Sequence, residues 1–452
     1  PLVIWARPEF VTDVSRKDLM DQIRLRLMTA QNAIEVESLS DVADQLLQGH
    51  SILFIEGIAS AMAIETKGWT SRGIEKPAAE STVLGPQVSL SEIIRDSIAL
   101  IRLRLRSADL VIQRMQLGRK SVTDVVVLYL DGIAPPEIVK EVRRRLESLD
   151  VDMVLDTSEL RQMMSDHPFS FLEGGRLTER PDTVAAELND GRVAIIANNS
   201  PNALIVPNNY FMAFEAADDR YINPLAASLF RLIRQTAVLI SLFGTAAYVG
   251  IVTFHHELIP LPLLLNIAAT QEGVPFPLGL TAILTEAVME ILREAGVRLP
   301  QQFGGAVSIV GALVLGQAAI QAGFVPPGLV IVVTLGTIAS FAVPRSERII
   351  SARIIRYPLI VLASIWGFYG VMLGVTIFIY HLSSLKSLGV PAFELYRPGE
   401  VGRLSIKLAM PPPHLQPSTR PLARHDKVRR GKLPKPRDPK QNAKGSDRER
   451  PD

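Results

Sequence analysis

The pattern of apolar and polar residues divides the chain into two unlike halves. Up to about residue 231 the apolar runs are short, and strand-like runs such as TDVVVLYLDG (123–132) alternate with amphipathic segments such as PPEIVKEVRRRLESLD (135–150). This alternation is typical of an α/β domain. Because a similar unit occurs twice, we predict two α/β subdomains, residues 1–118 and 119–231.

Individual elements follow from local periodicity. SILFIEG (51–57) and AMAIETKG (61–68) predict a β-hairpin, and SLSEIIRDSIALIRLRLRS (89–107) predicts a helix. Ser89 or Ser91 could cap its start, and Glu92 follows Ser89 at the spacing of a capping box. Further predicted elements are strands at 109–118, 123–132, 151–156, 192–199 and 203–209, and helices at 135–150 and 180–191.

The second half is apolar, and we predict a transmembrane helical domain over residues 232–385. A helix needs about 20 apolar residues to cross a bilayer, and four uncharged segments reach that length: 235–254, 304–324, 326–344 and 357–380. Small residues, including Gly370 and Gly374 at a GxxxG spacing, favour close packing of helices. The combination predicts an α/β domain followed by an α-helical polytopic membrane domain.

A fifth apolar stretch, 258–300, is interrupted. Proline fixes φ and removes a hydrogen-bond donor, so no regular helix is expected through Pro275 and Pro277. Non-helical backbone at membrane depth survives only where protein buries it or where it lines water. We therefore predict a broken or re-entrant element, with a helix after Pro277 that ends at Gly296 and that Pro300 prevents from resuming.

That helix carries a charged face within about a 100° arc, formed by Glu286, Glu290, Arg293 and Glu294. Glu290 and Arg293 are i,i+3 partners. One interpretation is an amphipathic helix at the membrane interface with its charges in water. The other is a charged face along an ion path or vestibule, where carboxylates would favour cations.

The arginines suggest an orientation. Arg231 and Arg234 precede the first span, so the positive-inside rule puts the N-terminal half on the cytoplasmic side. The same rule asks that RSERIISARIIR (345–356) and the basic C-terminal tail both be inside, although only one predicted span separates them. An interfacial position for 345–356 would remove the conflict. We expect an even number of spans with both termini inside.

The C-terminal tail, 386–452, differs from the rest in composition. From Val401 onward it has 14 Lys and Arg against 5 Asp and Glu, whereas the whole chain has a net charge of only +2. Nine prolines follow residue 410, so we predict a disordered tail. It could bind anionic membrane lipid, or serve only to keep the chain soluble.

No motif in the sequence indicates catalysis. There is no G-x-S-x-G, P-loop, H-E-x-x-H or strand-linked G-x-G-x-x-G motif, and there is no cysteine. We therefore expect a protein that is not an enzyme, with no catalytic, cofactor-binding or metal residues, no cofactor and no nucleic-acid partner.

Several motifs occur together in one order: LFIEG, ETKGW, LIRLRL and LGRKSVTDVVVLYLDGIA in the first half, and PFPLGLTAILTEAVMEILREAGVRLP (275–300) in the second. With them the chain resembles the A subunits of the GerA spore-germination receptor family over about residues 50–390. The paralogous stage V sporulation protein AF shares these motifs. Where the family commonly has a run resembling VVRGPREGF, this chain has TVLGPQVS (82–89).

The resemblance implies a location and partners. Such proteins sit in the inner membrane of the bacterial endospore with a cytoplasmic N-terminal domain of two α/β subdomains. They act with a transporter-like B subunit and a lipoprotein C subunit. They form a homo-oligomeric ring, thought to be a pentamer, that acts as a nutrient-gated cation channel.

Three hypotheses of function follow. The first is a nutrient-gated cation channel with the charged face near its path. The second is a non-conducting signalling scaffold for a transporter-like partner that senses the nutrient. The third is a secondary transporter, which broken helices would also fit, but no internal repeat supports it.

Overall fold

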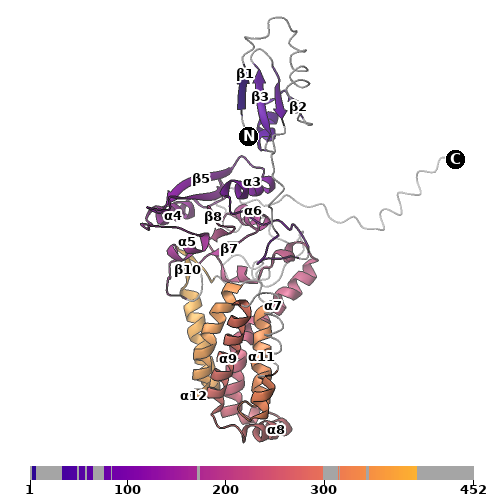
Figure 1. Cartoon of the computed structure of the whole chain (residues 1–452), viewed down its shortest axis with the longest axis vertical. Helices are drawn as coiled ribbons and strands as arrows, with labels where there is room; N and C mark the ends of the chain where they lie inside the picture. Colours follow the sequence, from indigo (N-terminus) through magenta and orange to yellow (C-terminus); the bar gives the residue numbers. More distant parts are fainter. Residues whose placement is uncertain are drawn as a thin grey trace, which may run out of the picture.

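The computed structural model describes residues 3–6, 33–47, 50–55, 59–64, 76–82, 84–170, 174–298, 314, 316–342 and 346–393. Figure 1 shows three parts in sequence order: a four-stranded sheet, a five-stranded sheet with its helices, and a bundle of long helices. The fold is thus an α/β region followed by a helical part.

The four-stranded sheet has the order β1-β3-β4-β2. The predicted hairpin at 51–64 is confirmed, because β3 and β4 pair antiparallel. Ile52 and Ala63 are fully buried in a small core against helix α2. The elements are β1 Val3–Ala6, β2 Ala33–Val36, α2 Leu39–Leu47, β3 Ser51–Ile55 and β4 Ala61–Ile64.

The five-stranded sheet has the order β5-β6-β8-β9-β7, and every neighbouring pair is antiparallel. Its strands are β5 Leu110–Leu117, β6 Thr123–Leu130, β7 Arg176–Thr178, β8 Val193–Ala197 and β9 Ala203–Val206. Its helices are α3 Ile94–Arg104, α4 Pro136–Glu147, α5 Thr157–Met163 and α6 Pro181–Asn189.

Both faces of this sheet are buried, which explains the unbroken apolar run of β6. Val126 and Leu128 belong to the core beneath α3 and α6. Val125 and Val127 belong to the core beneath α4 and α5. Since successive side chains of a strand point to opposite faces, a strand buried on both faces needs apolar residues at every position.

Three details of the N-terminal half differ from prediction. Helix α3 begins at Ile94, and Ser89 contacts the carbonyl oxygen of Glu179 rather than capping α3. Residues 151–156 form no strand. Strand β5 pairs with β6 along its whole length, so a boundary at residue 118 would divide one sheet. We propose that any division into subdomains lies before α3.

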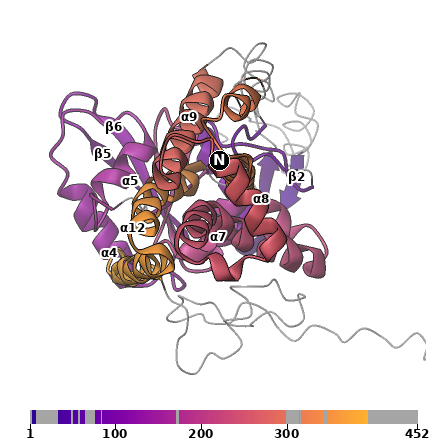
Figure 2. The ribbon, with the colours of Figure 1, turned by 90° about the horizontal axis from the view of Figure 1, so that it is seen from below.

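The helical bundle contains α7 Pro224–Phe254, α8 Leu261–Gln271, α9 Leu278–Arg298, α11 Pro327–Phe341 and α12 Ser346–Ser384. The short 3-10 turns η1 Tyr210–Phe214 and η2 Ala217–Arg220 connect the sheet to α7, and η3 His256–Leu258 follows α7. Helix α8 lies at the end of the bundle opposite the α/β region, as Figures 1 and 2 show.

Helix α12 is a hairpin rather than one continuous rod. Gly367 has φ 58° and ψ −137°, which interrupts the helix. A Cβ atom on Gly370 would overlap the carbonyl oxygen of Leu362, so the two legs run side by side. Gly374 lies equally close to Leu359. The predicted close packing at the GxxxG spacing is therefore confirmed, and it occurs between the two legs.

This hairpin divides the predicted span 357–380 into two helical legs. Because the chain turns back at Gly367, two helical legs, rather than one span, separate the predicted segment 345–356 from the residues after α12. His381 near the end of α12 contacts Ser170 of the α/β region. The start and end of α12 therefore lie at the same end of the bundle.

By length and hydropathy, two stretches of the described residues could cross a membrane: Pro224–Phe254 and Arg353–Ser384. The second is the hairpin just described. Helix α11 has 15 residues, fewer than the about 20 that a helix needs to cross a bilayer and that the predicted span 326–344 nearly reached. Most of the predicted span 304–324 lies outside the described residues.

The predicted broken element is two helices with a turn between them. Pro260 precedes α8, and Pro262 lies in its first turn, a position where proline is tolerated. Pro275 and Pro277 lie in the turn between α8 and α9. Gly296 does not end α9, which continues to Arg298. Pro300 lies outside the described residues.

The beginning of the predicted tail is structured. Strands β10 Lys386–Ser387 and β11 Val390–Pro391 form a small hairpin, and Leu388 packs into the core beneath α4 and α5. The tail prediction therefore starts too early. Residues 394–452, which include its basic part, lie outside the described residues.

Candidate functional site: charged residues inside the helical bundle

The four predicted residues of the charged face lie on α9, but their surroundings differ. Glu286 is only 5% exposed and faces the interior of the bundle. The side chain of Glu290 is 37% exposed, and that of Glu294 is 60% exposed. The four residues therefore run from the core to the surface of the bundle instead of forming one water-facing surface.

Glu286 is held by residues from two neighbouring helices. Arg356 of α12 donates from Nη1 to Oε2 of Glu286 at 2.5 Å and from Nη2 to the hydroxyl of Ser241 at 2.8 Å. Thr245 donates its hydroxyl to Oε1 of Glu286 at 2.8 Å. A buried charge is tolerated only when it is paired and hydrogen-bonded, and this carboxylate meets both conditions.

Glu290 and Glu294 lie one and two turns further along α9, and their side chains are more exposed than that of Glu286. Glu290 accepts hydrogen bonds from Arg353 of α12 and, at 3.2 Å, from Arg293. The guanidinium of Arg293 also lies 5.6 Å from the centre of the Phe341 ring, a cation–π distance. Glu294 pairs with Arg298 at 2.6 Å on the exposed surface.

The sequence interpretation missed the two arginines of α12. The segment 345–356 was expected to be a cytoplasmic or interfacial segment, whereas Arg353 and Arg356 lie against α9. One signal in the sequence could have indicated this pairing. Arg353 and Arg356 are spaced i,i+3 and Glu286 and Glu290 are spaced i,i+4, so each pair lies on one face of its helix and the two faces can meet when the helices run antiparallel. The hydroxyls of Ser241 and Thr245 gave no signal, because such residues are ordinary in apolar helices.

The two arginines of α12 change the net charge of the cluster from the expected negative value to a positive one. Glu286 and Glu290 contribute two negative charges, while Arg293, Arg353 and Arg356 contribute three positive ones. The cluster of these five side chains is therefore not an acidic surface. In the part of the chain that the structure describes, no group of three or more His, Asp and Glu side chains could hold a metal ion.

The chain thus combines an α/β region with a helical part that contains two stretches long and apolar enough to cross a membrane. A family model described as the Bacillus/Clostridium GerA spore germination protein matches residues 9–421. The chain belongs to this GerA family. The resemblance seen in its motifs is thereby confirmed.

Several characterised and uncharacterised relatives are similar over most of the chain. Spore germination protein KA of Bacillus subtilis (strain 168) is 40% identical over 395 residues, which are 87% of this chain and 72% of the relative. The uncharacterized membrane protein YfkQ of the same organism is 38% identical over 379 residues, 82% of this chain and 74% of the relative.

The solved structures also include a match. The crystal structure of the N-terminal domain of the A subunit of the Bacillus megaterium spore germinant receptor GerK3 has 27% sequence identity and a TM-score of 0.32. The match covers 44% of this chain and 70% of that chain.

Proposed function

We propose that this chain is the A-type membrane subunit of a spore germination receptor. In this proposal it converts a nutrient signal into germination by forming, with further copies of itself, a nutrient-gated cation channel. Family membership supports the role in germination. The observation that carries the channel proposal is helix α9, which introduces ionisable residues into an apolar bundle. Such residues usually mark ion or substrate pathways.

The accessible end of α9 is the proposed conducting part. Glu286 is buried and neutralised by Arg356, so an ion passing it would have to break that pair. Glu290 and Glu294 remain accessible near the C-terminal end of α9. The proposed path therefore runs between copies of the chain, beside Glu290, rather than through the bundle of one copy.

The distribution of charge supports an orientation with the α/β region in the cytoplasm. At the end of the bundle next to the α/β region, Arg231 and Arg234 of α7 pair with Asp219 of η2. The described residues at the opposite end, 255–277, include Glu257 and Glu272 but neither lysine nor arginine. By the positive-inside rule, the arginine-rich end is cytoplasmic. The proposed location is the inner membrane of the endospore, together with a transporter-like subunit and a lipoprotein subunit.

The channel proposal is tested by substituting Glu290 in oligomers reconstituted into liposomes. Glu290→Gln removes an accessible carboxylate, and we expect the permeability for K⁺ relative to Cl⁻ to fall severalfold, because carboxylates along a path favour cations. Glu147→Gln, at an exposed position of α4 in the α/β region, is the matched control. A selectivity that is equal in both variants would contradict a path beside Glu290.

A second candidate function is the non-conducting scaffold. The observation that favours it is the pairing of the cluster, in which Glu286 is neutralised and arginines outnumber carboxylates. It predicts that purified oligomers carry no current in planar bilayers, even though spores without the chain fail to respond to nutrient.

A further inference from the structure

The connection between the α/β region and α7 depends on one buried carboxylate. Asp219 of the turn η2 is 1% exposed and accepts hydrogen bonds from two arginines at the start of α7. Arg234 donates to both of its oxygens at 2.8 Å, and Nε of Arg231 donates at 3.1 Å. The backbone N–H of Ala216 adds a contact at 3.2 Å. The first turns of α7 are thereby fixed to η2.

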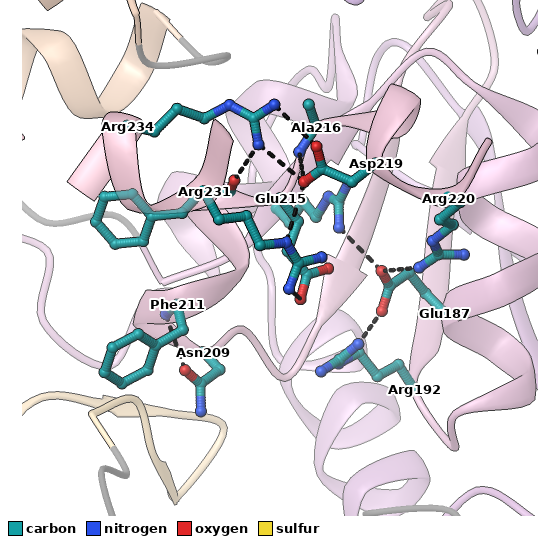
Figure 3. Close-up of polar contacts among 12 residues, drawn as sticks. Glu187, Arg192, Asn209, Phe211, Glu215, Ala216, Asp219, Arg220, Arg231 and Arg234 are labelled. Carbon is teal, nitrogen blue, oxygen red and sulfur yellow. Dashed lines mark hydrogen bonds and ion pairs between the residues drawn. The ribbon is translucent and has the colours of Figure 1, made fainter. Parts of the chain in front are cut away.

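The next residue of the same turn points the other way, as Figure 3 shows. Arg220 donates to Glu187 of α6 at 3.2 Å. Glu187 is itself buried and also accepts from Arg176 of β7, at 2.9 Å, and from Arg192. Two adjacent residues of one short turn therefore bind different parts of the molecule: Asp219 binds α7, and Arg220 binds Glu187 of α6, which also pairs with Arg176 of β7.

The charge state of this junction is firmly set. Burial alone would raise the pKa of Glu215, but the guanidinium charges of Arg231 and Arg176 outweigh it and hold the pKa below its usual value. Glu215 therefore remains anionic beside Arg231 at neutral pH. The ion pair of Glu215 with Arg231 therefore adds to the contacts of Asp219 in holding the junction.

Helix α7 continues from this junction to the charged cluster of the bundle. Arg234, Ser241 and Thr245 lie on the same helix, and the last two contact Arg356 and Glu286. With a rise of about 1.5 Å per residue, the distance from Arg234 to Thr245 along α7 is about 16 Å. A shift of the start of α7 thus reaches the hydroxyls that hold the buried pair.

We propose that η2 is the mechanical joint of the molecule: a displacement of the α/β region is transmitted through Asp219 to α7, and through α7 to Glu286 and Arg356. The hairpin β10–β11 after α12 provides a second attachment. Leu388 packs beneath the sheet, and the hydroxyl of Ser387 contacts the carbonyl oxygen of Gly174. Because the sheet is attached to the helices both at η2 and at the β10–β11 hairpin, a movement of the sheet must also move the helices.

The joint is tested by measuring distances in the full chain. The sequence has no cysteine, so cysteines at the exposed positions Ser148 and Thr236 can carry two spin labels without background. The label at residue 148 reports on the α/β region, and the label at residue 236 reports on α7. We expect Asp219→Asn to broaden the distribution of distances between them, because both arginines of α7 lose their charged partner.

Two controls separate a joint from general stability. Asp131→Asn removes an exposed carboxylate elsewhere in the α/β region and should leave the distribution narrow. Val142→Ala creates a cavity beneath the sheet, away from η2, and should lower the melting temperature without broadening the distribution. If Asp219→Asn broadens it no more than Asp131→Asn does, η2 is not a joint.

A double variant examines whether the two residues act in series. If Asp219 and Arg220 are successive links, then Asp219→Asn with Arg220→Gln broadens the distribution no more than the wider single variant. If the broadening in the double variant equals the sum of the broadening in the two single variants, the two residues make independent stabilising contacts and the proposal is overturned.

The signalling part of this inference rests on the proposed function and has its own measurement. Spores with Asp219→Asn should respond to a complete nutrient mixture about fivefold or more slowly, the lower range of typical coupling between sites. An unaltered response would overturn the transmission. If the unsubstituted chain does not support germination, the proposed function fails, while the distance measurement still decides whether η2 is a joint.

Discussion

The five-stranded sheet and the helical bundle differ in how they distribute large apolar side chains between interior and surface. The interior of the sheet region consists of large branched side chains, and Leu128, Ile195 and Ile196 are fully buried. The bundle instead buries many small and polar side chains, among them Ser241, Thr245, Thr281, Glu286, Thr337, Ser340 and Arg356. Leu329 and Ile360 lie in its core, but many other large apolar residues point outward, among them Ile331, Leu335 and Ile338 of α11.

The difference shows which solvent each region is built for. In water, burial of apolar surface drives folding, so large apolar side chains collect inside. In a bilayer the surroundings are as apolar as leucine, and helices associate by close packing and hydrogen bonds between them. Buried hydroxyls, contacts at glycine and a paired charge are therefore the expected interior of a membrane bundle.

The largest test of this comparison is to break the buried ion pair. Arg356→Met leaves Glu286 without its charged partner inside the bundle, and we expect a loss of about 3–5 kcal/mol in the free energy of unfolding. The measurement is an SDS titration of the purified chain in mixed micelles. Methionine keeps the volume of the arginine stem, so the loss reflects charge rather than a cavity.

Two further variants define what that loss means. Glu286→Met together with Arg356→Met removes both charges and should be less destabilising than Arg356→Met alone, because no charge remains unpaired. Arg298→Ala removes one partner of the exposed pair with Glu294 and should change stability by no more than about 0.5 kcal/mol. Equal losses for Arg356→Met and Arg298→Ala would contradict a buried, essential pair.

The sequence predicted those features that have a local cause. The apolar run within TDVVVLYLDG (123–132) predicted a strand, and residues 123–130 form β6 between two cores. The helical periodicity after Pro277 predicted α9, although not its end. In these segments side-chain pattern and backbone preference point to the same structure, so local reasoning suffices.

The features it missed depend on distant contacts. Arg353 and Arg356 meet α9 across 63 and 70 residues of chain, a pairing that no local pattern encodes. The turn at Gly367 lies within 24 apolar residues, which are long enough for one span. Only the packing of Gly370 and Gly374 against Leu362 and Leu359 shows that the chain turns back. Length and hydropathy cannot separate one long span from two legs.

A second test compares leucines of the two regions directly. Leu128→Ala removes a fully buried side chain beneath the sheet and should cost about 2–5 kcal/mol of folding free energy. Leu335→Ala truncates a side chain on the outer surface of α11 that is 52% exposed, and in micelles it should cost less than about 1 kcal/mol. Chemical unfolding followed separately in each region measures both, and a larger loss for Leu335→Ala would show that its surface is covered by protein.

The smallest expected effects are those of two glycine-to-alanine substitutions, which should change the folding stability in opposite directions. Gly370→Ala places a methyl group against the carbonyl oxygen of Leu362 and should destabilise the hairpin of α12 by about 1–3 kcal/mol. Gly244→Ala in α7 meets only Ile240, at an ordinary distance of 3.7 Å, so it should stabilise by about 0.5–1 kcal/mol through helix propensity alone. SDS titration of both variants gives the two signs. If Gly370→Ala were also stabilising, the legs of α12 would not pack as closely as described, and Arg353–Ser384 would behave as one continuous span.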